Sequence, residues 1–184
     1  MAAARPAEVV AFWRAAGPDK WYAKDEAFDA EIRDRFEALH HSAARGELSD
    51  WAADWQGALA LIILLDQFPR NMFRGSAHAF ATDPVARSLT SAALDAGLDR
   101  QCPEDLRVFF YLPLEHSETL ADQDRCVALC EALDAASGST WARWSKLHRD
   151  IIVRFGRFPH RNAALGRRAT NEEQEFLDQG GFSG

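Results

Sequence analysis

Residues 59–65 are apolar at every position, and this segment constrains the fold more than any other. Ser49, a residue type that caps helices, precedes it, so we interpret the segment as helical. A helix that is apolar on every side has to be buried on every side. The apolar run is far shorter than the roughly 20 residues that cross a bilayer. The sequence therefore predicts a central buried helix, which Phe68-Pro69 should end because the residue before proline disfavours helical geometry.

Helical signals recur along the rest of the chain, and no segment shows the alternation typical of a strand. Asp25 can cap a long helix that ends at Gly46, and Thr170 opens a capping box with Glu173. Further helices are predicted at residues 8–16, 83–97 (with Asp83 as the cap), 103–111, 114–133 and 140–155. The fold class is therefore all-α, with about eight to ten helices in antiparallel pairs and one domain over residues 1–184.

Composition excludes several classes of protein. The formal net charge of −7 argues against a nucleic-acid partner, and we expect no membrane partner either. The start of the chain lacks the apolar core of a secretory signal, which favours a cytoplasmic location. The three cysteines, Cys102, Cys126 and Cys130, lack the spacing of a metal site. We therefore expect no cofactor and no metal; the oligomeric state is left open.

Asp66 and Gln67 are polar residues at the end of the apolar helix. An acid at a helix C-terminus is disfavoured by the helix dipole, so Asp66 needs a compensating partner. Arg70 or Arg74 could supply it. Either a buried Asp–Arg pair fixes this turn, or a ligand site is built on it.

A second polar group begins at Glu115. Spacings of three and four residues place Glu115, Glu118 and Asp122 on one face of the predicted helix 114–133. Like charges at this spacing weaken a helix by a few tenths of a kcal/mol each. Pairing with arginines is the simplest compensation, while a carboxylate metal site or a general acid–base pair are alternatives.

A third group begins at His148, which lies within an apolar helical stripe. It is either a core histidine with a hydrogen-bond partner or a catalytic residue. Residues 143–168 contain eight arginines or lysines and one acid, Asp150. Arg157 and Arg161 flank a proline turn in this segment. Their guanidinium groups could hold a phosphate or carboxylate of a ligand, or they could form ion pairs with acidic residues of the protein itself.

Several short sequence segments of this chain resemble those of the family called domain of unknown function 924. The resemblance rests on residues 64–71 (LLDQFPRN), 116–118 (HSE), 122–123 (DQ), 148–152 (HRDII) and 154–162 (RFGRFPHRN). It covers about residues 9–182. It implies a tetratricopeptide-like array of stacked helix pairs and no established activity.

Three functions stay open. The first is a pocket that binds a small anionic molecule, with or without catalysis; no reaction type follows, since no known catalytic motif is present. Candidate catalytic residues are His116, Glu118, His148 and His160. Candidate ligand-binding residues are Asp66, Gln67, Arg70, Asn71, Arg74, Asp122, Gln123, Arg154, Arg157, Arg161, Asn162 and Arg167.

The second function is a tetratricopeptide-like module that binds a protein or an acidic peptide in a concave groove. The third is a structural polar network that holds helices together without any ligand.

Overall fold

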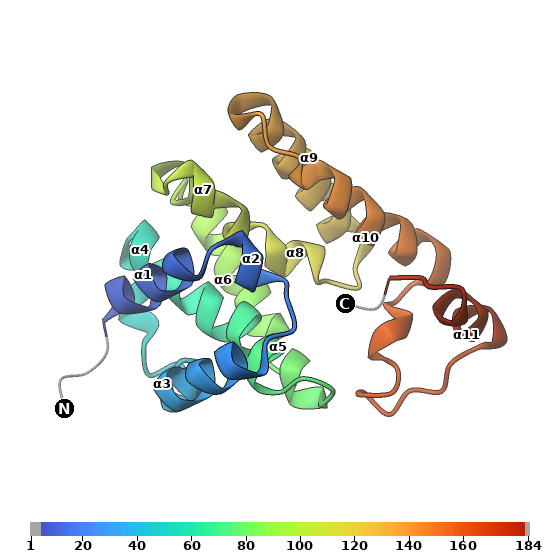
Figure 1. Ribbon diagram of the computed structural model, residues 1–184. Coiled ribbons are helices and arrows are strands. Elements are labelled where there is room, and N and C mark those ends of the chain that lie inside the picture. Colours follow the sequence, from blue (N-terminus) through green and yellow to red (C-terminus); the bar gives the residue numbers. More distant parts are fainter. Residues whose placement is uncertain (1–4, 183–184) are drawn as a thin grey trace. The chain divides into compact units, whose positions relative to one another are not determined.

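Helices account for all the regular structure in residues 5–182, the part of the chain that the computed structural model describes (Figure 1). No strand occurs in this range, which confirms the all-α prediction. None of these helices is long and apolar enough to span a membrane. The chain divides into two compact units, unit 1 up to Arg74 with His78–Pro113, and unit 2 with Gly75–Ala77 and the residues from Leu114 on. The expectation of one domain stays a prediction.

Unit 1 is built around the apolar segment identified in the sequence. Its elements are α1 (Pro6–Ala16), α2 (Pro18–Trp21), α3 (Glu26–Ala44), η1 (Ser49–Ala53), α4 (Trp55–Ile62), η2 (Ile63–Gln67), α5 (Phe68–Met72), η3 (Ala77–Phe80), α6 (Asp83–Asp95), η4 (Asp99–Gln101), α7 (Glu104–Arg107) and η5 (Val108–Phe110). Helix α4 packs against α1 and α6, and α3 packs against α5. Residues 57–65 are all buried, as the prediction of a central helix requires.

Large aromatic rings fill the core of unit 1. Trp13 is fully buried and packs edge-to-face on Phe68 and Phe109, with ring centroids 5.7 and 5.6 Å apart. The indole N–H of Trp21 donates to the Trp13 carbonyl at 2.7 Å. Such ring pairs stabilise a core beyond the area that they bury.

The central helix does not end at Phe68-Pro69, and that prediction was wrong. Helix α4 continues into η2, which is a π-helix, and then into α5, with Phe68 in helical geometry (φ −59°, ψ −37°). The Phe68 N–H donates to the carbonyl of Ile63, five residues back. Pro69 has no N–H, so one carbonyl before it lacks a backbone donor. The wider π-turn accommodates the proline within the helix.

Side chains complete this π-turn. Each of its last three carbonyls before Gln67 accepts a side-chain hydrogen bond: Leu64 from His40 Nδ1 at 2.8 Å, Leu65 from Thr82 Oγ1 at 2.6 Å, and Asp66 from Arg70 Nη1 at 2.5 Å. Donors from α3, from the start of α6 and from α5 therefore converge on one turn. These side chains give the buried carbonyls the hydrogen-bond donors that they need.

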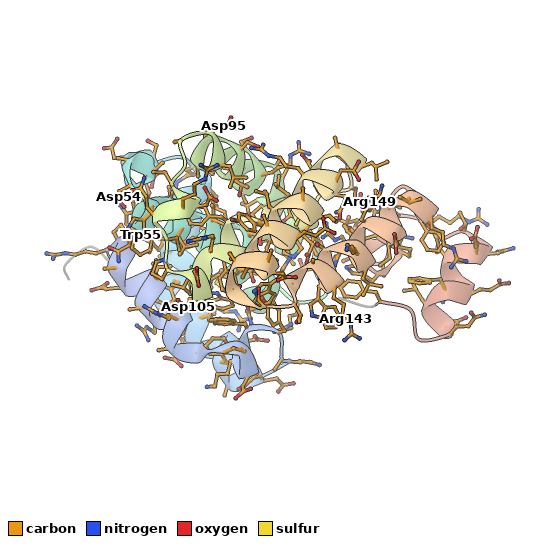
Figure 2. All side chains as sticks on the ribbon, turned by 90° about the horizontal axis from the view of Figure 1, so that it is seen from above. Asp54, Trp55, Asp95, Asp105, Arg143 and Arg149 are labelled. Carbon is orange, nitrogen blue, oxygen red and sulfur yellow. The ribbon has the colours of Figure 1, made fainter. Side chains whose placement is uncertain are left out.

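Helix starts in unit 1 follow ordinary capping rules, with one shift. The Asp54 carboxylate accepts from the Gly57 N–H at 2.9 Å and caps α4. Figure 2 labels Asp54 and Trp55, the cap and the first residue of this helix. The cap of α6 is Thr82, one residue earlier than predicted. Asp83 is the first residue of that helix, and its carboxylate binds Arg70 instead.

Unit 2 contains a pair of long helices and a shorter one. Its elements are α9 (Leu120–Ser137), α10 (Trp141–Phe155), η6 (Pro159–Arg161) and α11 (Asn171–Asp178), while α8 (Leu112–Glu115) crosses the division between the units. Helices α9 and α10 run side by side (Figure 1). Gly156 ends α10 in left-handed geometry, and Thr170 and Glu173 form the predicted capping box of α11.

The predicted helix over residues 114–133 is interrupted. Helix α8 ends at Glu115 and α9 begins at Leu120. The Gln123 amide donates to the carbonyls of Glu115 and Ser117 at 2.6 and 2.7 Å, which stabilises the non-helical link. The predicted stripe of Glu115, Glu118 and Asp122 along one helix face was therefore wrong.

Candidate functional site

The candidate residues are distributed over both units. Asp66, Gln67, Arg70, Asn71 and Arg74 belong to unit 1, and the other candidates belong to unit 2. Each set is positioned by the elements of its own unit. Their convergence on one pocket stays a prediction.

Asp66 is part of a buried ion-pair network at the π-turn. The Asp66 side chain is fully buried, and its Oδ1 lies 3.3 Å from Arg70 Nη1. Arg70 also binds Asp83 with two hydrogen bonds of 2.9 Å, and the Gln67 amide donates to Asp66 Oδ2 at 2.6 Å. Burial acts to lower the pKa of Arg70, but the two carboxylates raise it. This is the buried Asp–Arg pair that the sequence suggested as one of two alternatives.

Arg74 and Asn71 bind a different carboxylate, that of Asp29 in α3. The Asn71 amide donates to Asp29 Oδ1 at 2.8 Å, and Arg74 donates to both oxygens at 2.5 and 3.0 Å. Asp29 is buried, and it was not among the predicted site residues. A signal was present, because Asp29 shares the helical spacing of the apolar residues Ile32 and Phe36.

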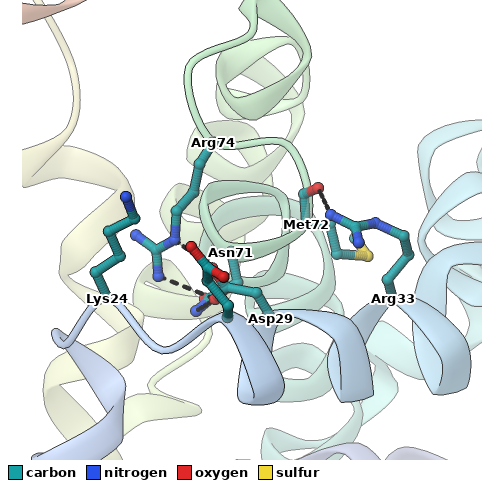
Figure 3. A pocket seen from close by; sticks show the side chains of 7 residues that line it. Lys24, Asp29, Arg33, Asn71, Met72 and Arg74 are labelled. Atoms are coloured by element: carbon teal, nitrogen blue, oxygen red, sulfur yellow. Dashed lines mark hydrogen bonds and ion pairs between the residues drawn. The ribbon is translucent and has the colours of Figure 1, made fainter.

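A pocket of about 270 Å³ opens beside this pair (Figure 3). It is lined by Lys24, Glu26, Asp29, Arg33, Asn71, Met72 and Arg74. Figure 3 shows Lys24 and Arg33 on opposite sides of the Arg74–Asp29 pair. Arg33 donates to the Met72 carbonyl at 2.5 Å. Within residues 5–182, neither Lys24 nor Arg33 has a carboxylate within ion-pairing distance.

In unit 2, Glu118 accepts three hydrogen bonds from two residues. Arg167 donates to its two oxygens at 2.7 and 3.0 Å, and the Phe158 N–H donates at 2.8 Å. Burial acts to raise the pKa of Glu118, but these donors lower it overall. A carboxylate held ionised in this way is suited to positioning the loop before η6, not to acid catalysis.

Arg157 and Asn162 meet at a second carboxylate, that of Glu173. Arg157 donates to it at 2.6 and 2.7 Å, Asn162 at 3.2 Å, and the Thr170 N–H at 2.7 Å. The Arg157 guanidinium is the main cause that holds the pKa of Glu173 at about 2. Glu173 was predicted only as part of a capping box, because a sequence does not show which distant arginine will reach it.

The three candidate histidines of unit 2 lie near one another. The ring of His148 is 6.4 Å from that of His116, and His148 and His160 each lie 5.6 Å from Phe158. His148 is buried, and its Nδ1 is 2.9 Å from the Trp144 carbonyl and 3.4 Å from Glu115 Oε1. These contacts fit a core histidine with hydrogen-bond partners.

The remaining candidates of unit 2 have separate roles. Arg154 pairs with Glu172 at 2.9 Å on the surface, and Asp122 accepts from Ser117 at 2.6 Å. Arg161 is buried and lies over the Phe158 ring, 4.6 Å from its centre.

The sequence profile of a family described as "Bacterial protein of unknown function (DUF924)" matches residues 9–181. The chain belongs to the DUF924 family. A solved structure of a protein of unknown function from Agrobacterium tumefaciens is 49% identical, with a TM-score of 0.89, and the alignment covers 95% of this chain and 97% of that one. No curated protein matches the chain.

Membership in DUF924 confirms the resemblance and brings no activity with it. In this DUF924 chain, the strings that carry the resemblance include Asp66, Arg70 and Glu118, which form carboxylate–arginine pairs. Asp66 pairs with Arg70 four residues later, whereas Glu118 pairs with Arg167, 49 residues further along the chain. In this chain, part of the resemblance therefore lies in residues that form internal ion pairs.

Proposed function

We propose that this DUF924 protein binds a small anionic molecule, a carboxylate or a phosphate, in the pocket lined by Lys24, Arg33 and Arg74. The supporting observation is that two cations at this pocket have no carboxylate partner in residues 5–182. Arg74, in contrast, is neutralised by Asp29. An anion between Lys24 and Arg33 would supply the missing charge.

The chemistry of the two cations suits such a ligand. One Arg33 nitrogen is occupied by the Met72 carbonyl, which fixes the guanidinium while leaving further N–H groups for an anion. Lys24 contributes a mobile point charge from the opposite side. A volume of about 270 Å³ lies just below the range typical of drug-sized ligands and favours a small acid.

The basic segment of unit 2 is a weaker candidate for the same ligand. Arg157 and Arg167, which the sequence suggested as anion ligands, each bind a carboxylate with two hydrogen bonds. An arginine whose fork already holds a carboxylate has to release it before it binds another anion. This favours the pocket in unit 1 over the segment around η6.

A thermal-shift screen with small carboxylates, inorganic phosphate and pyrophosphate tests the proposal. A ligand at a hundred times its Kd adds about 2.7 kcal/mol. At this chain length that should raise the Tm by roughly 5–10 °C. The double variant Lys24→Gln/Arg33→Gln should fold and lose this shift. The matched control is Arg100→Gln, an exposed arginine of the same unit that does not line the pocket.

Two results would contradict the proposal. One is the absence of a shift with every anion in the screen. The other is an equal loss of the shift in the double variant and in Arg100→Gln, which would indicate a nonspecific charge effect. A shift produced only by acidic peptides would support the second function, a peptide-binding module.

A further inference from the structure

Three histidine rings of unit 1 gather beside the π-turn. His40 and His41 lie near the end of α3, and His78 lies in η3. Their ring centroids are 5.1, 5.8 and 5.6 Å apart. One ligand nitrogen from each ring lies within 4.8 Å of the other two. The proposed anion pocket includes none of these residues.

The three rings are held by different means. His40 is fully buried, while His41 and His78 are partly exposed. The ring of Phe73 stacks on His78 with centroids 3.9 Å apart and planes within 4°. Successive residues of a helix point about 100° apart, so His41 reaches the cluster from the side while His40 points inward. The cluster therefore has a buried base and an accessible opening.

The hydrogen bond of His40 fixes its tautomer. His40 Nδ1 lies 2.8 Å from the Leu64 carbonyl, which can only accept a hydrogen bond. The proton of the neutral ring is therefore on Nδ1, and Nε2 carries a lone pair. That Nε2 is buried and has no hydrogen-bond partner. Burying an unpaired acceptor costs about 1–3 kcal/mol, so a native protein that keeps one needs a reason for it.

The surroundings also lower the pKa of the His40 ring. Burial is the main cause that lowers the pKa of His40, and the neighbouring His41 and His78 lower it further, while the Leu64 hydrogen bond and Glu37 act in the opposite direction. Neutral imidazole is the form that coordinates metals. A second-shell carbonyl that holds the other ring nitrogen is typical of metal-bound histidines.

We propose that His40, His41 and His78 form a three-histidine site for a first-row transition-metal dication of the Zn²⁺ class. Imidazole nitrogens suit Zn²⁺, Ni²⁺ and Cu²⁺ and not the hard ions Ca²⁺ and Mg²⁺. Zn–N bonds of about 2.0–2.1 Å in a tetrahedral site place the nitrogens about 3.3 Å apart. The rings therefore need to close by no more than about 1.5 Å from their separations of up to 4.8 Å.

Three protein ligands leave a fourth position for water or for a ligand atom, as in catalytic zinc sites. Glu37, one turn before His41, adds a carboxylate at the opening, with its Oε1 3.8 Å from His41 Nε2. Its negative charge favours a bound dication. The expectation of no metal rested on the spacing of the three cysteines and took no account of His40 and His41. The missed signal is that His40 continues the buried spacing of Ile32 and Phe36.

The test is titration of the chelator-treated, untagged full chain with Zn²⁺ by calorimetry and with Co²⁺ by visible absorption. The wild type should bind one equivalent of Zn²⁺ and give the intense absorption of tetrahedral Co²⁺. Two single variants, His78→Gln and His41→Gln, should each weaken Zn²⁺ binding at least about 100-fold, since even second-shell changes cost 10–100-fold. Both residues are partly exposed, and circular dichroism checks that each variant folds.

His116→Gln is the matched control, because His116 is a partly exposed histidine of unit 2. It should bind Zn²⁺ as the wild type does, and so should Lys24→Gln/Arg33→Gln, which separates this site from the anion pocket. The proposal is overturned if the wild type binds no Zn²⁺. It is also overturned if His116→Gln loses as much affinity as the folded cluster variants.

Discussion

Replacing Glu173 by glutamine is expected to lower the free energy of unfolding by about 2–3 kcal/mol, because it leaves charged donors without their acceptor. Glu173 is 2% exposed and accepts four hydrogen bonds from three residues: Arg157, Asn162 and Thr170. Glutamine has the same shape but no charge, and its amide presents N–H groups to other donors. Urea denaturation at pH 7 measures the loss.

The effect should depend on pH with a definite sign. Arg157 is the main cause that holds the pKa of Glu173 at about 2 in the folded protein, against an ordinary value of 4.5. The stabilisation is therefore fully present above about pH 4.5 and is lost as the pH falls toward 2. The gap between wild type and Glu173→Gln should narrow as the pH is lowered below 4.5, when both are followed by urea denaturation.

The neighbouring residue gives a matched control. Glu172 pairs with Arg154 at 2.9 Å, but its side chain is 61% exposed. Glu172→Gln should change stability little, because exposed ion pairs contribute little. Equal losses for Glu172→Gln and Glu173→Gln would show that the bonds of the buried carboxylate add nothing to stability.

Gly57→Ala should destabilise the protein by at least about 3 kcal/mol, which is at the upper end of the range for overpacked cores. A Cβ at Gly57 would lie 1.8 Å from the carbonyl oxygen of Trp51, and neither atom belongs to a side chain that can rotate away. Relief therefore requires η1 to move relative to the start of α4. Urea denaturation of the variant measures the cost.

Gln56→Ala is the control for this prediction, since it changes the preceding residue of the same helical turn without adding a Cβ. It should alter stability by less than about 0.5 kcal/mol. If Gly57→Ala proves as stable as Gln56→Ala, the close approach of Trp51 and Gly57 is not a constraint on the fold.

Local rules predicted a large part of the architecture. Gly156 ends α10 and Thr170 opens α11 where the sequence placed these signals, because glycine at a helix end and a capping box act within a few residues. The need of Asp66 for a positive partner was also readable, and Arg70 is close enough in sequence to supply it.

The errors arose where tertiary contacts override local preference. A proline after an apolar helix predicts a break, but side chains from distant residues, His40 and Thr82, supply donors at the turn before Pro69. The link between α8 and α9 depends in the same way on Gln123. The cluster of His40 with His78 joins positions far apart in the chain, so no spacing rule could reveal it.

The π-turn at residues 63–67 also determines the direction in which the side chains of the following helix, α5, point. One extra residue in a helical turn rotates all later side chains by about 100° relative to an uninterrupted α-helix. Asn71, which follows the π-turn, donates to Asp29 with this offset in place. Deleting a single residue from the segment would therefore preserve a helix while turning its far end to a different face. In this fold, the length of one helical turn therefore affects which side chains after residue 67 line the pocket beside Asp29.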